Sequence, residues 1–261
     1  MTPNRSIVFF DIDGTLYNHK KELPISTKNA VLQLKELGHE VAIATGRAPF
    51  MFEELREELG IDTYVSYNGQ YVVVNGEVVY KNPLNRNSII KLTETAVERN
   101  HPVVYMDHED MKANVPEHQY ITESIETLKI GRFPTHDPSY YEDRELYQAL
   151  LFCLKEEEDY YVEQFQDFDF VRWHPYSTDI LPSGGSKANG IQRVVAKLEI
   201  PNERVYAFGD GLNDIEMLSE IYHSVAMGNG VEEAKRAAKH VTKSVEEDGI
   251  LHGLKMVGLL K

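Results

Sequence analysis

The stretch FFDIDGTLYN, residues 9–18, places two aspartates directly after a run of apolar side chains. The preceding residues 6–10, SIVFF, are short, β-branched and aromatic, which predicts a buried strand. Asp11 and Asp13 follow where this strand should end, and Gly14 introduces a turn. Asp-Gly is common turn chemistry, so a plain turn is one explanation. A pair of carboxylates that works on a ligand is the other.

Composition limits the kind of protein that carries this stretch. The chain has 261 residues, of which 42% are hydrophobic, so it is long enough for a sizeable core. Its net charge of -15 repels nucleic acid and anionic membrane surfaces, and we expect neither as a partner. Any anionic substrate must therefore be attracted locally, by a metal or a few cations.

The single cysteine and the absence of long apolar runs exclude further classes of protein. Cys153 excludes an internal disulfide framework and a cysteine zinc site, and its apolar context predicts a buried side chain. No apolar run approaches membrane-spanning length, and MTPNRS, residues 1–6, lacks the pattern of a signal peptide. We therefore expect a cytoplasmic protein. No feature of the sequence predicts its oligomeric state.

Strands and helices alternate at both ends of the chain. The expected strands are 6–10, 40–45, 63–68, 204–210 and 223–228, and the expected helices begin at Ser26 or cover 49–60, 187–198, 213–221 and 231–240. The first helix should bury Ala30, Leu34 and Leu37, and Pro49 should open the second. Residues 71–81 are expected to form a hairpin around Asn75-Gly76. This alternation predicts an α/β, Rossmann-like core: a mostly parallel sheet with helices on both faces.

The middle of the chain follows a different pattern, in which strands come in adjacent pairs. Its expected strands are 102–107, 110–115, 145–155, 168–174 and 176–182, and its expected helices are 88–99, 117–127 and 156–166. Such a pattern predicts an inserted α+β domain, with an antiparallel sheet and helices on one side. Pro83 and the PSGGS segment mark its ends. We therefore expect a discontinuous core, 1–83 and 183–261, and an inserted domain, 84–182.

Polar side chains follow several strands of the predicted core sheet. Asp11 and Asp13 follow the first strand, Thr45 ends the second, and Asp210 follows a later one. The carboxyl ends of parallel strands line one edge of a sheet, where such folds bind ligands. Carboxylates converging there repel one another unless a hard cation binds between them, and Mg²⁺ suits such oxygen ligands.

A second acidic stretch, GDGLND at 209–214, supports this site. Asp210 and Asp214 flank a loop that leads into a helix, with Asn213 between them. Taken alone, a turn followed by a helix N-cap explains this stretch equally well. Its occurrence together with Asp11 and Asp13, again at the end of a strand, favours the site.

Four short motifs carry a resemblance to a known family. They are DIDGTL at 11–16, ATGR at 44–47, GGSK at 184–187 and GDGLND at 209–214. In this order and spacing they resemble the signature motifs of the haloacid dehalogenase-like (HAD) phosphohydrolases, and the whole chain resembles the Cof-type branch, subfamily IIB. The first and fourth motifs are highly specific, whereas the second and third are weak alone.

The resemblance implies a role for each motif residue. Asp11 would be the nucleophile that forms an aspartyl-phosphate, and Asp13 the general acid and base. The implied Mg²⁺ ligands are Asp11, Asp13 through its backbone carbonyl, Asp210 and Asp214. The implied phosphate-binding residues are Thr45, Gly46, Lys187 and Asn213. The inserted domain would serve as a cap that closes over the site.

Two further residues are candidates for the substrate side of the site. Arg47 would reach the substrate or pair with one of many nearby glutamates, with equal weight on each. Asn68 belongs to the stretch YNG, which resembles a Cof-type loop beside the active site, although Asn-Gly is first of all a turn pair.

The predicted function is Mg²⁺-dependent hydrolysis of a small phosphorylated metabolite, such as a sugar phosphate, FMN or pyridoxal phosphate. A phosphomutase of the same subfamily would share all four motifs and stays an alternative. A non-enzymatic phospho-acceptor is a weaker alternative, because it would lack the second aspartate of the first motif and a large inserted domain. A catalytically silent regulatory protein is weaker too, because every required residue is present.

Overall fold

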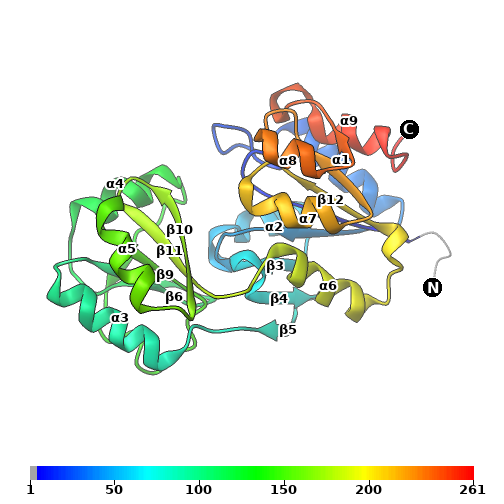
Figure 1. The fold of residues 1–261 in the computed structure, drawn as a ribbon. Coiled ribbons are helices and arrows are strands. Elements are labelled where there is room, and N and C mark those ends of the chain that lie inside the picture. Colours follow the sequence, from blue (N-terminus) through cyan, green and yellow to red (C-terminus); the bar gives the residue numbers. More distant parts are fainter. Residues whose placement is uncertain (1–4) are drawn as a thin grey trace. The chain divides into compact units, whose positions relative to one another are not determined.

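The computed structural model describes residues 5–261 and contains two compact units (Figure 1). Residues 1–4, on which part of the expectation about a signal peptide rests, lie outside the described residues. The first unit runs to Arg47 and includes Phe52–Lys81 and Ser186–Lys261, and the second comprises Ala48–Met51 and Asn82–Gly185. The main transitions between the two units lie at 81–82 and 185–186. No helix in the described part is long and apolar enough to cross a membrane.

The first unit is built on a sheet with the strand order β14-β13-β12-β1-β2-β3-β4-β5. Its strands are β1 (Ile7–Phe10), β2 (Glu40–Ala44), β3 (Tyr64–Ser66), β4 (Tyr71–Val74), β5 (Glu77–Lys81), β12 (Val205–Gly209), β13 (His223–Ala226) and β14 (His240–Val241). All pairs from β14 to β3 are parallel, and β4 and β5 add an antiparallel edge. The mostly parallel core sheet is therefore confirmed.

Helices bury both faces of this sheet. They are α1 (Ile25–Glu36), α2 (Glu53–Leu59), α6 (Lys187–Leu198), α7 (Ile215–Glu220), α8 (Glu232–Ala237) and α9 (Gly249–Met256). Ile191 of α6 and Met217 of α7 share one core cluster with Phe9. The alternate residues Val8 and Phe10 point to the opposite face and are equally buried, while α1 and α9 contact each other. Strand β1 is therefore covered on both sides.

Two local expectations about these helices are wrong. Leu37 is 58% exposed, because α1 has already ended at Glu36 and Leu37 is its C-cap. Pro49 opens only a 3₁₀ turn (Pro49–Met51), and α2 begins after Phe52, whose φ of -137° is not helical. The hairpin between β4 and β5 is confirmed, with φ of 51° at Asn75 and 78° at Gly76, as a primed turn requires.

The second unit is an α+β structure of its own. Its sheet has the order β10-β11-β9-β6-β7-β8, and every pair is antiparallel except β7 with β8. The strands are β6 (Val103–Met106), β7 (Met111–Ala113), β8 (Thr135–His136), β9 (Gln148–Phe152), β10 (Phe168–His174) and β11 (Ser177–Pro182), and the helices are α3 (Arg86–Glu98), α4 (Gln119–Thr127) and α5 (Lys155–Gln164). Leu92 of α3 and Tyr161 of α5 share a core cluster with Tyr105 and Leu151 of the sheet. Cys153 is buried and free, as predicted.

Candidate active site

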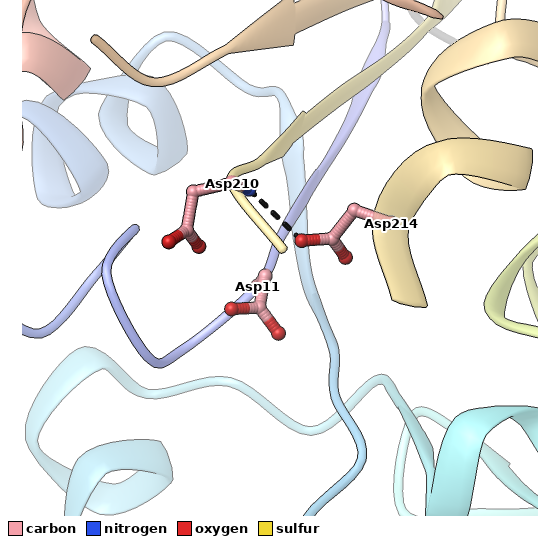
Figure 2. A group of neighbouring side chains, drawn as sticks. All are labelled: Asp11, Asp210 and Asp214. Atoms are coloured by element: carbon pink, nitrogen blue, oxygen red, sulfur yellow. Dashed lines mark hydrogen bonds between the residues drawn. The ribbon is translucent and has the colours of Figure 1, made fainter. Parts of the chain in front are cut away.

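Three carboxylates converge at the carboxyl edge of the core sheet (Figure 2). Asp11 follows β1 and Asp210 follows β12, and these strands are parallel neighbours with Phe10 opposite Phe208. Asp214 ends the 3₁₀ turn Leu212–Asp214. One carboxylate oxygen from each of Asp11, Asp210 and Asp214 lies within 4.8 Å of the others. The predicted convergence of the first and fourth motifs is thus present in the structure.

The turn after β1 is shaped around Asp210. Gly14 has a φ of 80°, and a Cβ atom there would lie 2.1 Å from Oδ2 of Asp210. Thr15 Oγ1 donates a hydrogen bond to Oδ1 of Asp210 (3.1 Å), and Asn229 Nδ2 donates to the carbonyl of Gly14 (2.8 Å). Sequence reasoning missed Asn229, because it lies in a loop that carries no motif of its own. Only glycine allows this approach of the turn to the carboxylate.

Both carboxylate oxygens of Asp214 accept hydrogen bonds from other groups of the protein. Its Oδ2 accepts hydrogen bonds from the backbone N–H groups of Asp210 and Gly211, each at 2.9 Å. Its Oδ1 accepts from Nζ of Lys187 at 2.7 Å, and the residue is fully buried. The carboxylate of Asp214 therefore orients the loop after β12 and the side chain of Lys187.

Lys187 is the first residue of α6, and its side chain is completely buried. Nζ donates to Oδ1 of Asp11 at 2.5 Å as well as to Asp214. Burial acts to lower the pKa of Lys187, but the two carboxylates raise it above its usual value, so the ammonium stays charged. The lysine of the third motif thus contacts two carboxylates of the acidic cluster.

The ionised carboxylates of Asp11, Asp210 and Asp214 repel one another at these short distances. Burial raises the pKa of Asp11 well above its usual value, and the neighbouring carboxylates add to the rise although Lys187 opposes it. Burial and the nearby Asp214 likewise raise the pKa of Asp210 to about 6. An all-oxygen donor set of this kind fits a divalent cation such as Mg²⁺, which would relieve the repulsion.

Asp13 lies apart from the three-carboxylate cluster and is held by two cations. Arg47 binds it in a bidentate manner, from Nε to Oδ2 and from Nη2 to Oδ1, both at 2.7 Å. Nζ of Lys21 also donates to Oδ1. Although burial acts to raise the pKa of Asp13, Arg47 and Lys21 lower it to about 2. Lys21 was not expected at the site, and Arg47 was expected to reach the substrate or a glutamate and not Asp13.

The remaining predicted residues gather around the end of β2. Thr45 Oγ1 accepts from the N–H of Arg47 (3.1 Å), and the carbonyl of Thr45 accepts from the N–H of Asn68 (3.1 Å). Asn213 Nδ2 donates to Oδ1 of Asn68 at 3.0 Å. A Cβ atom on Gly46 would lie 3.1 Å from Nδ2 of Asn68. The loop after β2, Asn68 and Asn213 therefore form one contiguous region.

Comparison with known proteins places this chain in a family. Residues 8–254 match the family model described as haloacid dehalogenase-like hydrolase. The chain belongs to the haloacid dehalogenase-like hydrolases. Over 255 residues it is 50% identical to YkrA of Bacillus subtilis (strain 168), which is named as a candidate phosphatase, and the match covers 98% of each chain.

Solved structures agree with this assignment. A hypothetical protein from Geobacillus kaustophilus HTA426 has a TM-score of 0.95 and 57% identity, with 98% of this chain and 100% of that chain covered. The HAD subclass IIB sugar phosphatase BT4131 has a TM-score of 0.84 and 30% identity, with 98% and 100% covered. This HAD-like hydrolase is therefore a Cof-type, subclass IIB phosphohydrolase, as the four motifs predicted.

Proposed function

We propose that this protein hydrolyses small phosphomonoesters in a Mg²⁺-dependent reaction through an aspartyl-phosphate on Asp11. The observation that carries the proposal is the contact of Asp11 with the buried ammonium of Lys187, within 4.8 Å of carboxylate oxygens of Asp210 and Asp214. A carboxylate in contact with a fixed cation, next to a group of oxygen ligands, fits nucleophilic attack on phosphorus.

The proposed reaction has two steps, formation of the aspartyl-phosphate and its hydrolysis. A carboxylate oxygen of Asp11 attacks phosphorus, the bond from phosphorus to the ester oxygen breaks, and Asp13 gives its proton to the departing alkoxide. Water then attacks the phosphorus of the aspartyl-phosphate, Asp13 takes up a proton from it, and phosphate leaves as the carboxylate of Asp11 is restored. Lys187 offsets the negative charge that develops on the phosphoryl oxygens.

Mg²⁺ would be held by Asp11, Asp210 and the backbone carbonyl of Asp13, and when bound it supplies charge neutralisation of the phosphoryl oxygens. The bond from Lys187 uses Oδ1 of Asp11 and leaves the second oxygen for the cation. Both oxygens of Asp214 already accept hydrogen bonds from protein groups. We therefore assign Asp214 to the support of the cation site, and not to direct ligation.

Asp13 needs a change in its surroundings before it can act as an acid. Held by Arg47 and Lys21, it is an anion at neutral pH. The phosphoryl oxygens of an arriving substrate would compete for the guanidinium of Arg47. Each hydrogen bond that Asp13 loses raises its pKa, so that Asp13 takes up from solvent the proton that it then donates. Arg47 would thus bind the substrate and also determine when Asp13 can transfer a proton.

The loop after β2 provides the remaining phosphate contacts. Thr45 would offer its hydroxyl, and Gly46 would leave the backbone accessible to a phosphoryl oxygen. Asn213, whose side-chain amide also donates to Oδ1 of Asn68, would donate to the phosphoryl oxygens or to the rest of the substrate. A small phosphorylated metabolite is the expected substrate, and the likeness to the sugar phosphatase BT4131 favours a sugar phosphate.

The test is phosphate release by the purified protein from p-nitrophenyl phosphate and a panel of sugar phosphates, FMN and pyridoxal phosphate, with and without Mg²⁺. We expect release that requires Mg²⁺ and is lost in Asp11→Asn. No release from any substrate, or undiminished release by Asp11→Asn, would refute the proposal. Isomerised sugar phosphate appearing instead of free phosphate would identify a phosphomutase.

A further inference from the structure

Three consecutive residues between β3 and β4 have the left-handed backbone conformation. The φ angles are 51° at Tyr67, 50° at Asn68 and 97° at Gly69. We call residues 67–69 the left-handed turn. This conformation is unfavourable for a bulky residue such as Tyr67, whose side chain is completely buried. Such backbone strain persists only where the surroundings enforce it, and it is concentrated at functional sites.

The left-handed turn holds the loop after β2 by its backbone. The N–H of Tyr67 donates to the carbonyl of Arg47 at 3.2 Å, and the N–H of Asn68 donates to the carbonyl of Thr45 at 3.1 Å. Both acceptors belong to the second motif. The conformation of residues 45–47 is therefore tied to that of the turn.

Gly69 places the same turn directly against the start of α6. A Cβ atom on Gly69 would lie 2.1 Å from the carbonyl oxygen of Ser186 and 2.8 Å from its carbonyl carbon. On the helix side, a Cβ atom on Gly190 would lie 3.1 Å from Cα of Gly69. The two backbones thus touch at Ser186, which precedes Lys187, and at Gly190, three residues after it.

The side chain of Asn68 makes the third connection. Its Oδ1 accepts a hydrogen bond from Nδ2 of Asn213 at 3.0 Å. Asn213 is exposed and Asn68 partly buried, so this bridge lies outside the hydrophobic core. One turn of three residues consequently contacts the second, third and fourth motifs.

We propose that the left-handed turn is a positioning element that sets loop 45–47, Lys187 and Asn213 relative to one another. This inference rests on the proposed function and adds to it the part that aligns the phosphate-binding groups. A role in folding alone would need the packing of Tyr67 and Gly69. It would not need the amide bridge from Asn68 to Asn213, which can be removed without opening the core.

The decisive variant is Asn68→Gly. Glycine adopts a φ of 50° freely, so this change keeps the backbone and removes only the bridge. We expect a melting temperature within about 3 °C of the wild type. We expect kcat to fall roughly tenfold, because a misplaced phosphate-binding group costs about that much or more.

Asn75→Gly is the matched control. Asn75 has nearly the same φ, 51°, and lies exposed in the hairpin between β4 and β5. This variant changes the same residue type in the same conformation outside the turn, and its kcat and KM should equal those of the wild type. An equal loss of kcat in Asn75→Gly would show that the effect is unspecific and would overturn the proposal.

A double-mutant comparison tests whether the effect passes through Asn213. Asn213→Ala combined with Asn68→Gly should be no worse than the worse single variant, because both remove the same bridge. Unchanged kcat and KM in Asn68→Gly, or losses that multiply in the double variant, would overturn the proposal.

Binding of inorganic phosphate, measured by calorimetry with Mg²⁺, separates this proposal from the proposed function. If the wild type binds phosphate but hydrolyses nothing, the proposed function fails, and positioning is still tested by an expected tenfold weaker affinity in Asn68→Gly. Equal phosphate affinity in the two proteins would overturn the positioning role. If the wild type neither binds nor hydrolyses, both proposals fail.

Discussion

Lys187 and Asp11 lie 176 positions apart in the chain and meet through a hydrogen bond of 2.5 Å between Nζ and Oδ1. The lysine side chain is 0% exposed and the aspartate side chain 8% exposed. Because both charges are removed from water, neither is tolerated alone. We therefore expect the Lys187–Asp11 pair to contribute both to the stability of the fold and to catalysis.

Lys187→Met should lower both the free energy of unfolding and the rate of phosphate release. Leaving Asp11 and Asp214 without their cation is expected to lower the free energy of unfolding by about 3–5 kcal/mol near neutral pH. Phosphate release should fall by at least about 100-fold. Urea unfolding and initial rates measure the two effects. Lys197→Met, at an exposed position on the same helix, is the control and should change neither; equal stability of the two variants would contradict the buried ion pair.

Asp210→Asn should stabilise the metal-free protein and weaken its response to Mg²⁺. Removing one of three carboxylates that lie within 4.8 Å relieves their repulsion, so the melting temperature without metal should rise by about 2–5 °C. Added Mg²⁺ should stabilise the wild type far more than the variant. Melting curves with EDTA and with Mg²⁺ measure this. Asp62→Asn, at an exposed position, should behave as the wild type, and an unaltered Mg²⁺ response in Asp210→Asn would remove Asp210 from the cation site.

Asp13→Asn should separate proton transfer from metal binding. Its side chain contacts Arg47 and Lys21 and lies outside the three-carboxylate cluster. We therefore expect kcat to fall at least about 100-fold while the Mg²⁺ concentration for half-maximal activity stays the same. Steady-state rates at several Mg²⁺ concentrations test this. A large increase in the Mg²⁺ requirement would show that the carboxylate itself binds the cation.

Asp107 in the second unit should make stability depend on pH. Its carboxylate accepts from Tyr140 and Arg144, each at 2.7 Å, and these bonds with two backbone N–H groups lower its pKa although burial acts to raise it. The folded pKa thus lies below the unfolded value of about 3.9. The stabilisation is complete above about pH 5 and is lost as the pH falls through the folded pKa.

Comparison of the wild type with Asp107→Asn by urea unfolding tests this dependence. The variant should be less stable by about 1–3 kcal/mol at pH 7, and the difference should shrink toward pH 3. Asp159→Asn, at an exposed position of α5, should show no such trend. A difference that is constant from pH 7 to pH 3 would contradict the role of the ionised carboxylate.

The sequence predicted most of the fold, because its strands are continuous apolar runs and its helices have clear apolar faces. Strand β14 was missed because it has only two residues, His240 and Val241, both exposed. Helix α9 was missed because it opens with Gly249 and contains Gly253, two residues that disfavour helices. Helix α9 is stabilised by the burial of Ile250 and Leu254, and β14 by its pairing with β13, and not by local preference.

The sequence predicted the convergence of those site residues that directly follow a strand of the core sheet. Asp11 and Asp210 directly follow strands of the core sheet, so parallel topology predicts that they meet, whereas Lys187 begins α6 and was expected at the site only from the family resemblance. Asn229 and Lys21 were missed, because what brings them to Gly14 and Asp13 is the path of loops after folding. No local pattern encodes such contacts.

The position of β1 between β2 and β12 has a consequence for synthesis on the ribosome. Strand β1 ends at Phe10, but its partner β12 begins only at Val205. At about 5–20 residues per second, one edge of this apolar strand stays unpaired for about 10–40 s. During that time residues 82–185 can complete a sheet of their own. Asp11 thus acquires its neighbours only in the last stage of chain growth, and a nascent chain halted before β12 would expose an aggregation-prone edge.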